Sequence, residues 1–456
     1  MRKYNGCIKE DDKMKKALSI LLLACLSLTL LGMTQDIARA NNSEDIKTQI
    51  LTYTEEWFRD NFSEHYDISG YSANISNFQK NDAKVYAEIA IGAITTLKYD
   101  SVEELPYMRG IKDKLKINSL AEIVPTEYVA QASAAAAKEL QKAEMQPVYG
   151  HSLSVITDEN YVPDFVSYQM AAKRIVDGSN MSITETQAMN LSKQIADAYI
   201  DAAECIGVGT LLTLDLSIES TYSDGKISHV TLYESDDGNV IGSADEVIPQ
   251  TAREMTAQAK QDIVKYLKNN DSELESITTN GLSTYDRVAA RDYAWEHTYP
   301  GYGVNTYNKD EDGWLAPNDC GHGYYVDRSF WNNEDYPTAT CLANEHCHSD
   351  CACFVSQCLV AGGVPMSSTW QFKSNGSPTY AWHNVNGLKN YMTNNGYWDK
   401  STFSACNAGN VVYTSSGHVT LCTLNDTATR RYTAHTNDRN NKIYSSVYAC
   451  YVINGN

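Results

Sequence analysis

The sequence predicts an α+β protein whose C-terminal domain packs a nucleophile-bearing helix on an antiparallel sheet, preceded by one or two α+β accessory domains. Three observations support this class. Helix-like and strand-like segments are mixed between residues 44 and 268. An amphipathic helix begins at Cys351, and two strand-like segments separated by the turn Ser415-Ser416-Gly417 follow it.

The N-terminus resembles a secretory signal peptide over residues 1–40. Met14-Lys15-Lys16 precedes an apolar run from Ala17 to Leu31, and Ala38-Arg39-Ala40 provides a small-x-small cleavage pattern. We expect translation to start at Met14 and the mature chain to be secreted, extracellular or associated with the cell wall, without membrane insertion after cleavage. A lipoprotein site at Cys25 is the weaker interpretation, because the apolar run continues beyond it.

Charge and length limit the classes of function. The roughly 416 residues after the predicted cleavage point suit two or three domains. The net charge of −20 argues against nucleic acid and anionic membrane surfaces as partners. Residues 281–456 carry 11 Lys and Arg against 15 Asp and Glu, and the preceding 280 residues carry 26 against 42. Most of the acidity therefore lies upstream of the C-terminal third.

The upstream region contains the accessory elements, in two parts. An amphipathic helix is expected over 44–60, strands over Tyr66–Phe78 and Ala83–Tyr99, and a further helix over 127–145. The second part has helices at 183–205 and 245–268, with a hairpin around Ser223-Asp224-Gly225 formed by Thr210–Glu219 and Ile227–Tyr233. The predicted boundaries are 41–145 for an α+β domain, 146–268 for a second α+β region, separate from or continuous with the first, 269–281 for a polar linker, and 282–456 for the C-terminal domain.

The helix that begins at Cys351 has the features of a nucleophile-bearing helix. Asp350 can cap the helix by accepting hydrogen bonds from its first free N–H groups. The positive end of the helix dipole then favours the thiolate of Cys351. Cys353 points about 200° around the helix from Cys351, which makes it the less suitable nucleophile. Gly362-Gly363 ends the helix.

A candidate base follows 67 residues downstream. Gly409–Tyr413 is expected to form a strand, and His418 opens the next one, His418–Leu424. A third segment, Arg431–Asn437, contains His435, which could hydrogen-bond to His418 and fix its tautomer. Cys351, His418 and His435 would then form a triad of nucleophile, base and orienting residue. Asn437 competes with His435 for the third role.

Several ordered motifs carry a family resemblance. They are a helix Tyr285–Ala294, the pair Tyr307-Asn308, the segment Asp350-Cys351 through Gln357, Gly362–Met366, the tryptophans Trp370 and Trp382, and His418-Val419. With them, residues 285–453 resemble the bacterial putative amidase domain, which is similar in layout to NlpC/P60 and CHAP cysteine peptidases. The resemblance implies a papain-like fold with Cys351 as nucleophile, His418 as base and His435 at the third polar position. It also implies that Trp370 and Trp382 lie near the active-site cleft and line it.

We therefore expect a cysteine hydrolase that cleaves an amide bond without a cofactor. In that reaction the Cys351 thiolate attacks the carbonyl, His418 transfers the proton, and the backbone N–H of Cys351 contributes to an oxyanion hole. Compartment and resemblance suggest peptidoglycan or another extracellular peptide as substrate. The alternatives are a non-catalytic binding module with a disulfide-stapled papain-like fold, and a secreted interaction protein whose upstream domains hold the function.

Cysteine count leaves further possibilities open. Nine of the 12 cysteines follow residue 282, so a free Cys351 leaves eight that could form up to four disulfides. Cys358 and Cys422 lie in apolar stretches and suit unpaired core positions. A weaker hypothesis is a structural zinc site, for which the candidate ligands are Cys320, His322, Cys341 and Cys347. A disulfide-stapled loop explains the same residues without a metal.

Overall fold

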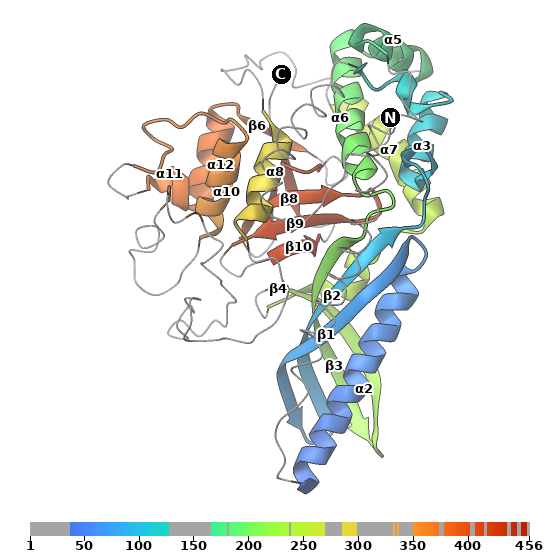
Figure 1. Ribbon diagram of the computed structural model, residues 1–456, viewed down its shortest axis with the longest axis vertical. Helices are drawn as coiled ribbons and strands as arrows, with labels where there is room; N and C mark the ends of the chain where they lie inside the picture. The colour runs from blue at the N-terminus through green and yellow to red at the C-terminus, as the bar shows by residue number, and fades with distance from the viewer. Residues whose placement is uncertain are drawn as a thin grey trace, which may run out of the picture.

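The computed structural model shows an α+β chain with a mixed sheet (Figure 1). It describes residues 37–126, 166–179, 182–236, 239–269, 285–298, 332, 335–336, 350–373, 378–401, 406–414, 417–435, 439–444 and 448–453. The predicted helix 127–145, most of the linker, and the proposed zinc ligands Cys320, His322, Cys341 and Cys347 lie outside these residues. No helix among those described is both long enough and apolar enough to span a membrane.

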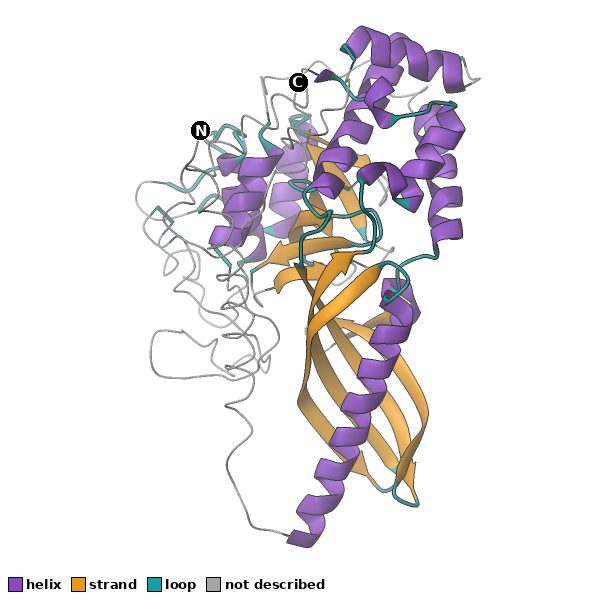
Figure 2. Cartoon of the chain, turned by 45° about the vertical axis from the view of Figure 1, so that its right-hand side comes forward, coloured by secondary structure: helices purple, strands orange, loops and turns teal. Residues whose placement is uncertain are grey.

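A long helix and a group of strands form the first part of the molecule. The helix carries buried residues at Ile46, Ile50, Phe58 and Phe62, a spacing that places them on the side facing the strands. It runs along the sheet in both views (Figures 1 and 2). The predicted helix 44–60 and both strands are confirmed. The elements are α2 (Ile37–Phe62), β1 (Tyr66–Asn81), β2 (Lys84–Leu97), β3 (Thr210–Ser223), β4 (Lys226–Asp236) and β5 (Asn239–Ser243).

The predicted hairpin around Asp224 is confirmed, with longer strands than expected. Asp224 and Gly225 have φ angles of 52° and 77°, the left-handed pair that a two-residue hairpin turn requires. β3 and β4 pair antiparallel up to Ser223 and Lys226 on either side of this turn.

Four helices cover the end of these strands. α6 begins at a capping box in which Thr184 and Gln187 exchange hydrogen bonds. Pro106 occupies the first turn of a helix, where its missing N–H costs nothing. The helices are α3 (Pro106–Leu115), α5 (Tyr168–Ser179), α6 (Glu185–Ala203) and α7 (Ala252–Asn269), with short 3-10 turns at Val102–Glu104, Leu120–Glu122 and Ala244–Val247.

The C-terminal third places helices against a set of antiparallel strands. α10 to α12 gather on one side of the strands, and α8 lies between them and the upstream helices (Figure 1). The helices are α8 (Arg287–Glu296), α10 (Cys351–Ala361), α11 (Tyr380–His383) and α12 (Val385–Asn394). The strands are β6 (Trp398–Ser401), β7 (Val411–Tyr413), β8 (Val419–Asn425), β9 (Arg430–Ala434), β10 (Arg439–Ile443) and β11 (Ala449–Ile453).

One sheet joins the upstream and C-terminal regions. Among the described strands its order is β1-β2-β3-β10-β9-β8-β7-β11-β6, with β4 and β5 branching from β3. The junction is a parallel contact of β10 with β3, at Lys442 and Thr213, and the other pairings are antiparallel. The upstream region therefore continues the sheet that carries the C-terminal site.

Buried charges reinforce this junction. The guanidinium of Arg431, which is 0 % exposed, pairs with Asp426 at 2.9 Å. It also donates to Thr95 Oγ1, Thr210 Oγ1 and the carbonyl of Leu211 on the upstream strands. A buried arginine left without such partners would be strongly destabilising. The C-terminal region thus depends on upstream oxygens to satisfy one of its core side chains.

A second charged cluster connects α6 with α8. Arg287 binds Asp197 at 2.6 Å and also Asp201, and Arg291 binds Glu204. Asp201 additionally accepts a hydrogen bond of 2.7 Å from the backbone N–H of Ala408. All of these side chains are buried. α6 therefore holds both the first helix of the C-terminal domain and the loop before β7.

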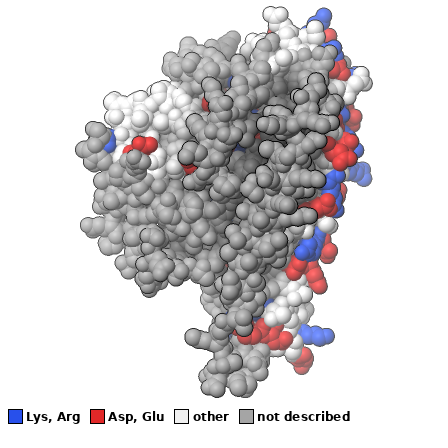
Figure 3. Space-filling view, viewed as in Figure 1, with Lys and Arg blue, Asp and Glu red and all other residues white. Residues whose placement is uncertain are grey.

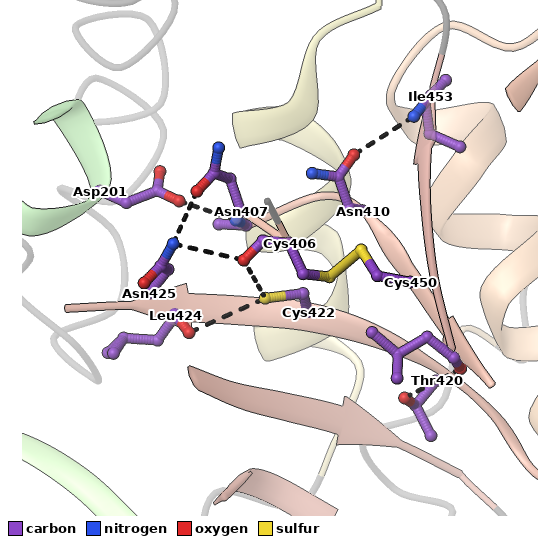
Figure 4. Close-up of a disulfide and its surroundings, with 12 residues drawn as sticks. Asp201, Cys406, Asn407, Asn410, Thr420, Cys422, Leu424, Asn425, Cys450 and Ile453 are labelled. Atoms are coloured by element: carbon purple, nitrogen blue, oxygen red, sulfur yellow. Dashed lines mark hydrogen bonds between the residues drawn. A yellow bond between two sulfur atoms is a disulfide. The ribbon is translucent and has the colours of Figure 1, made fainter. Parts of the chain in front are cut away.

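A single disulfide lies among the described cysteines, between Cys406 and Cys450 (Figure 4). Its Cα atoms are 5.8 Å apart, and it joins the loop before β7 to β11. Cys358 and Cys422 are free and buried, as is Cys205 upstream. Four disulfides are therefore not possible in the C-terminal domain. The expectation that Cys358 and Cys422 are unpaired core residues is confirmed.

Candidate active site

Cys351 is the first residue of α10, and its side chain lies in the interior. The carbonyl of Asp350 accepts the first intrahelical hydrogen bond, from the N–H of Phe354 at 2.9 Å. All residues from Cys351 to Leu359 are buried, so the helix is enclosed on every side rather than amphipathic at the surface. Cys351 is 5 % exposed. This placement puts its sulfur at the positive end of a buried helix dipole, where an anion is favoured.

His418 lies between two paired strands, immediately before β8. Tyr413, the last residue of β7, is directly opposite Val419, the first residue of β8. The backbone of His418 closes this turn: its carbonyl accepts from the N–H of Thr414 at 2.9 Å, and its own N–H donates to Thr414 Oγ1 at 3.1 Å. Gly417 has a φ of 87°, which a glycine adopts without strain. The turn therefore fixes the backbone of the candidate base.

Cys351 and His418 are brought together across the helix–strand interface. Burial of the thiol alone would raise the pKa of Cys351, but the charge of His418 and hydrogen bonds from the His418 side chain and the Val419 backbone N–H outweigh it. The pKa of Cys351 is therefore lowered from its ordinary value. A lowered pKa gives more thiolate at neutral pH, and the thiolate is the reactive form.

Asp350 occupies the N-cap position of α10, but the predicted capping bond is absent. Its side chain makes no hydrogen bond to the N–H groups of the helix. The carboxylate instead accepts from Nδ1 of His435 at 3.0 Å, with both side chains buried. Its negative charge raises the pKa of Cys351, opposing His418. The prediction that the Asp350 side chain caps the helix and thereby favours the thiolate is therefore wrong.

His435 follows β9 and is held between two other elements. Besides Asp350, its ring binds the carbonyl of His297 through Nε2 at 2.6 Å. The ring also stacks on Phe354, with centroids 3.8 Å apart. The two ring nitrogens therefore bind Asp350 and His297, and the predicted contact of His435 with His418 is not one of these hydrogen bonds. His435 instead connects the N-terminus of α10 to the end of α8. Asn437, the competitor for the third role, lies outside the described residues.

The other cysteines of α10 are enclosed in the core. Cys353 is 1 % exposed and Cys358 is 0 % exposed. Burial raises the pKa of Cys358 well above its ordinary value, and burial likewise raises the pKa of Cys422 on β8. Cys358 and Cys422 are therefore poor nucleophiles. The lowered pKa distinguishes Cys351 from both of them.

The two tryptophans expected to line the cleft are core residues. Trp370 and Trp382 are both 0 % exposed. Ser356 of α10 joins them: its hydroxyl donates to the carbonyl of Trp382 at 2.8 Å and accepts from Nε1 of Trp370 at 3.0 Å. They pack in the core and contact α10 through Ser356, and they do not line an accessible cleft. Their large apolar surfaces add to the buried core of this domain.

Several residues near the site were missed by the sequence analysis. The Val419 N–H reaches the Cys351 sulfur, the His297 carbonyl holds His435, and Tyr413 stands opposite Val419. Nearly every residue has a backbone donor and acceptor, so residue identity does not reveal which of them contact the site. No group of three or more His, Cys, Asp and Glu side chains suited to a metal ion is found within the described ranges.

Residues 284–452 match the family described as Putative amidase domain. The predicted resemblance is confirmed, and it covers Cys351, His418 and His435 within the C-terminal third. The match indicates a hydrolase of amide bonds. No curated protein and no solved structure matched the chain.

Proposed function

We propose that the protein is a secreted cysteine hydrolase that cleaves an amide bond of peptidoglycan or of another extracellular peptide. One observation carries the proposal: Cys351, at the start of a buried helix, accepts hydrogen bonds from His418 and the Val419 N–H, and its pKa is lowered. A papain-like arrangement of the C-terminal domain is part of this proposal. It is supported by a nucleophile on a helix that packs against an antiparallel sheet bearing the base.

The reaction would proceed in two steps. The Cys351 thiolate attacks the amide carbonyl, and the tetrahedral intermediate breaks the C–N bond to leave a thioester, while protonated His418 transfers its proton to the departing amine. Water, deprotonated by His418, then attacks the thioester, releasing the acid and restoring the thiol. The N–H of Cys351 at the helix N-terminus would stabilise the oxyanion. His435, held by Asp350 and His297, positions α10 rather than moving the proton.

Hydrolysis of defined substrates tests this function. The full chain is incubated with solubilised peptidoglycan fragments and with unrelated peptides, and mass spectrometry identifies newly formed amines. We expect Cys351→Ser to abolish cleavage and His418→Gln to lower kcat by roughly 10²–10⁴-fold. Cys353→Ser, two residues along the same helix, is the matched control and should retain activity.

The same experiment decides against the alternative. If Cys351→Ser cleaves as fast as the parent chain, the nucleophile has been assigned wrongly. If neither substrate class is cleaved while peptidoglycan is bound equally by both proteins, the chain is the non-catalytic binding module considered from the sequence. Cleavage of unrelated peptides but not of peptidoglycan would remove the cell-wall substrate and leave the chemistry intact.

A further inference from the structure

Lys389 on α12 is a half-buried lysine beside the candidate site. It lies one helical turn after Val385, whose carbonyl accepts a hydrogen bond from the Tyr413 hydroxyl at 3.3 Å. Tyr413 in turn stands opposite Val419, the residue whose N–H binds the Cys351 sulfur. Lys389 therefore reaches the end of β7 and β8 at which the nucleophile and the base meet.

Two aromatic rings hold the ammonium group. Lys389 Nζ lies 5.4 Å from the ring centroid of Tyr413 and 5.6 Å from that of Tyr451. These rings are in edge-to-face contact with centroids 5.3 Å apart, and both are largely buried. Such a pair orients a cation and removes part of its water without neutralising it. The positive charge of Lys389 is thus held at a defined position over the two rings.

Among the described residues, no acidic side chain pairs with Lys389. The other ion pairs near the domain core involve Asp197, Asp201, Glu204, Asp350 and Asp426, each with its own partner. The described surface of helices α10 to α12 is also mostly uncharged in the space-filling view, whereas both signs alternate along the upstream edge (Figure 3). A partly desolvated lysine that pairs with no acid in the described part of the chain can bind a carboxylate.

Tyr413 interacts with both the Lys389 ammonium group and Cys351. Burial, and then the neighbouring Tyr451 and Cys351, raise the pKa of Tyr413, which keeps it neutral and able to donate to the Val385 carbonyl. One neutral ring is thus close to the ammonium group and within electrostatic reach of the thiol. A ligand that extends from Cys351 along this ring would meet the positive charge of Lys389 at its other end.

We propose that Lys389, over Tyr413 and Tyr451, forms a carboxylate-binding subsite, so that the protein prefers amide substrates with an acidic residue on the acyl side of the cleaved bond. This inference rests on the proposed function, because the subsite is defined relative to Cys351. It identifies the class of substrate that the chemistry alone leaves open: anionic peptides rather than neutral or basic ones.

Active-site-directed alkylation tests the subsite. The full chain is treated with two-residue peptidyl chloromethyl ketones in which Glu, or its uncharged isostere Gln, occupies either of the two positions, and labelling of Cys351 is followed by mass spectrometry. At one position we expect the Glu probe to react about tenfold faster than the Gln probe, with a preference that declines as salt is added.

Three variants make the result specific. Lys389→Gln should remove the preference for Glu, and Lys389→Arg should keep a reduced preference. Lys265→Gln, an exposed lysine on α7, should leave the preference unchanged. Plain iodoacetamide should label Cys351 at the same rate in the parent chain and in Lys389→Gln, which shows that the nucleophile is intact.

Each contrary outcome has a distinct meaning. If Cys351 reacts with both probes equally, or if Lys389→Gln keeps the preference for Glu, the subsite is refuted and the cysteine hydrolase stands. If Cys351 reacts with neither probe and not with iodoacetamide, the proposed function fails and the subsite fails with it.

Discussion

Asp350 precedes Cys351 in the sequence, and its negative charge disfavours the thiolate form of Cys351. The carboxylate of Asp350 raises the pKa of Cys351, and His418 and the Val419 N–H lower it. The hydrogen bond from His435 gives the carboxylate a partner within the core. At the scale of single residues, the pKa of Cys351 is therefore a balance between His418, which favours the thiolate, and Asp350, which disfavours it.

Removing the acid should increase the reactivity of the thiol. Asp350→Asn keeps an oxygen that can accept from His435 but removes the charge, so the pKa of Cys351 should fall further. We expect iodoacetamide to label Cys351 faster at about pH 6 than in the parent chain, by severalfold, since each pKa step of one is tenfold in thiolate. Because Asn caps a helix about as well as Asp, capping alone predicts unchanged labelling, and an unchanged rate would contradict the opposing charge of Asp350.

Removing the base should have the reverse effect. His418→Gln deletes the charge that lowers the pKa of Cys351, so labelling at neutral pH should slow by roughly tenfold or more and require a higher pH. The pH at half-maximal labelling rate measures the change directly. An unchanged pH profile would show that His418 does not act on Cys351.

At this scale the sequence predicted residue identities better than contacts. Cys351 and His418 could be proposed because a cysteine at a helix start and a histidine at a strand start are visible in residue order, and the structure brings the two side chains together. The partners of Asp350 and His435 were not, because they depend on the carbonyl of His297 and on how α8 packs beside α10. These two contacts join residues 85 and 138 positions apart and follow from tertiary packing alone.

At the scale of elements, the sequence pattern predicted the start of β7 two residues too early, at Gly409 instead of Val411. Gly409 and Asn410 were expected in the strand, but they form a turn in which the N–H of Asn410 binds the carbonyl of Asn407 at 3.1 Å. Gly409 has a φ of 84°, and a Cβ there would lie 2.5 Å from Arg287. Close approach to α8, which no local pattern reports, therefore shortens the strand.

Two glycines allow this explanation to be tested. Gly409 and Gly417 have similar φ angles, 84° and 87°, but a Cβ at Gly417 would meet nothing within 4 Å. Gly417→Ala should therefore cost only about 1 kcal/mol of backbone strain, whereas Gly409→Ala should cost about 3 kcal/mol or more because it also forces α8 away. Equal losses in urea unfolding would contradict the close packing.

The α10 helix itself was well predicted from sequence, from its start at Cys351 to its end before Gly362. However, the helix is buried on every side from Cys351 to Leu359, and not on one apolar face alone. The sequence could not show this, because the covering tryptophans, Trp370 and Trp382, come from a later segment. Full burial explains why the predicted accessible lining by these tryptophans is not observed.

For the whole molecule, the continuous sheet and the buried ion pairs make the upstream region part of one folded unit. Arg431, Arg287 and Arg291 of the C-terminal region all depend on upstream partners. We expect residues 282–456 expressed alone to be insoluble or unfolded, and the full chain to unfold in a single transition. Two well-separated calorimetric transitions, or a stable active fragment, would show that the regions are independent.

Asp201 should make the stability of this junction depend on pH. Burial raises the pKa of Asp201 to about 6. Because that value exceeds the ~3.9 of an unfolded Asp, the folded state binds more protons in between, so the stabilisation is complete below about pH 4 and is lost as pH rises through 6. Asp201→Asn should therefore cost roughly 2 kcal/mol more at about pH 4.5 than at about pH 7.5.

The control for this prediction is an exposed acid. Asp113 pairs with Lys260 at the surface, with 60 % of its side chain exposed. Urea unfolding of Asp113→Asn should differ little from the parent chain at either pH. A pH-independent cost of Asp201→Asn would mean that the buried acid keeps an ordinary pKa beside Arg287.

The measurement that tests the central claim most directly is the pH dependence of alkylation at Cys351. The folded chain is labelled with iodoacetamide from about pH 5 to about pH 9, and the modified cysteine is located by mass spectrometry. We predict that Cys351 alone among the described cysteines outside the Cys406–Cys450 disulfide reacts below its reference pKa of ~8.5, and that this reaction disappears in Cys351→Ser. Labelling that begins only near pH 8.5, or that persists in Cys351→Ser, would contradict the assignment of Cys351 as an activated nucleophile.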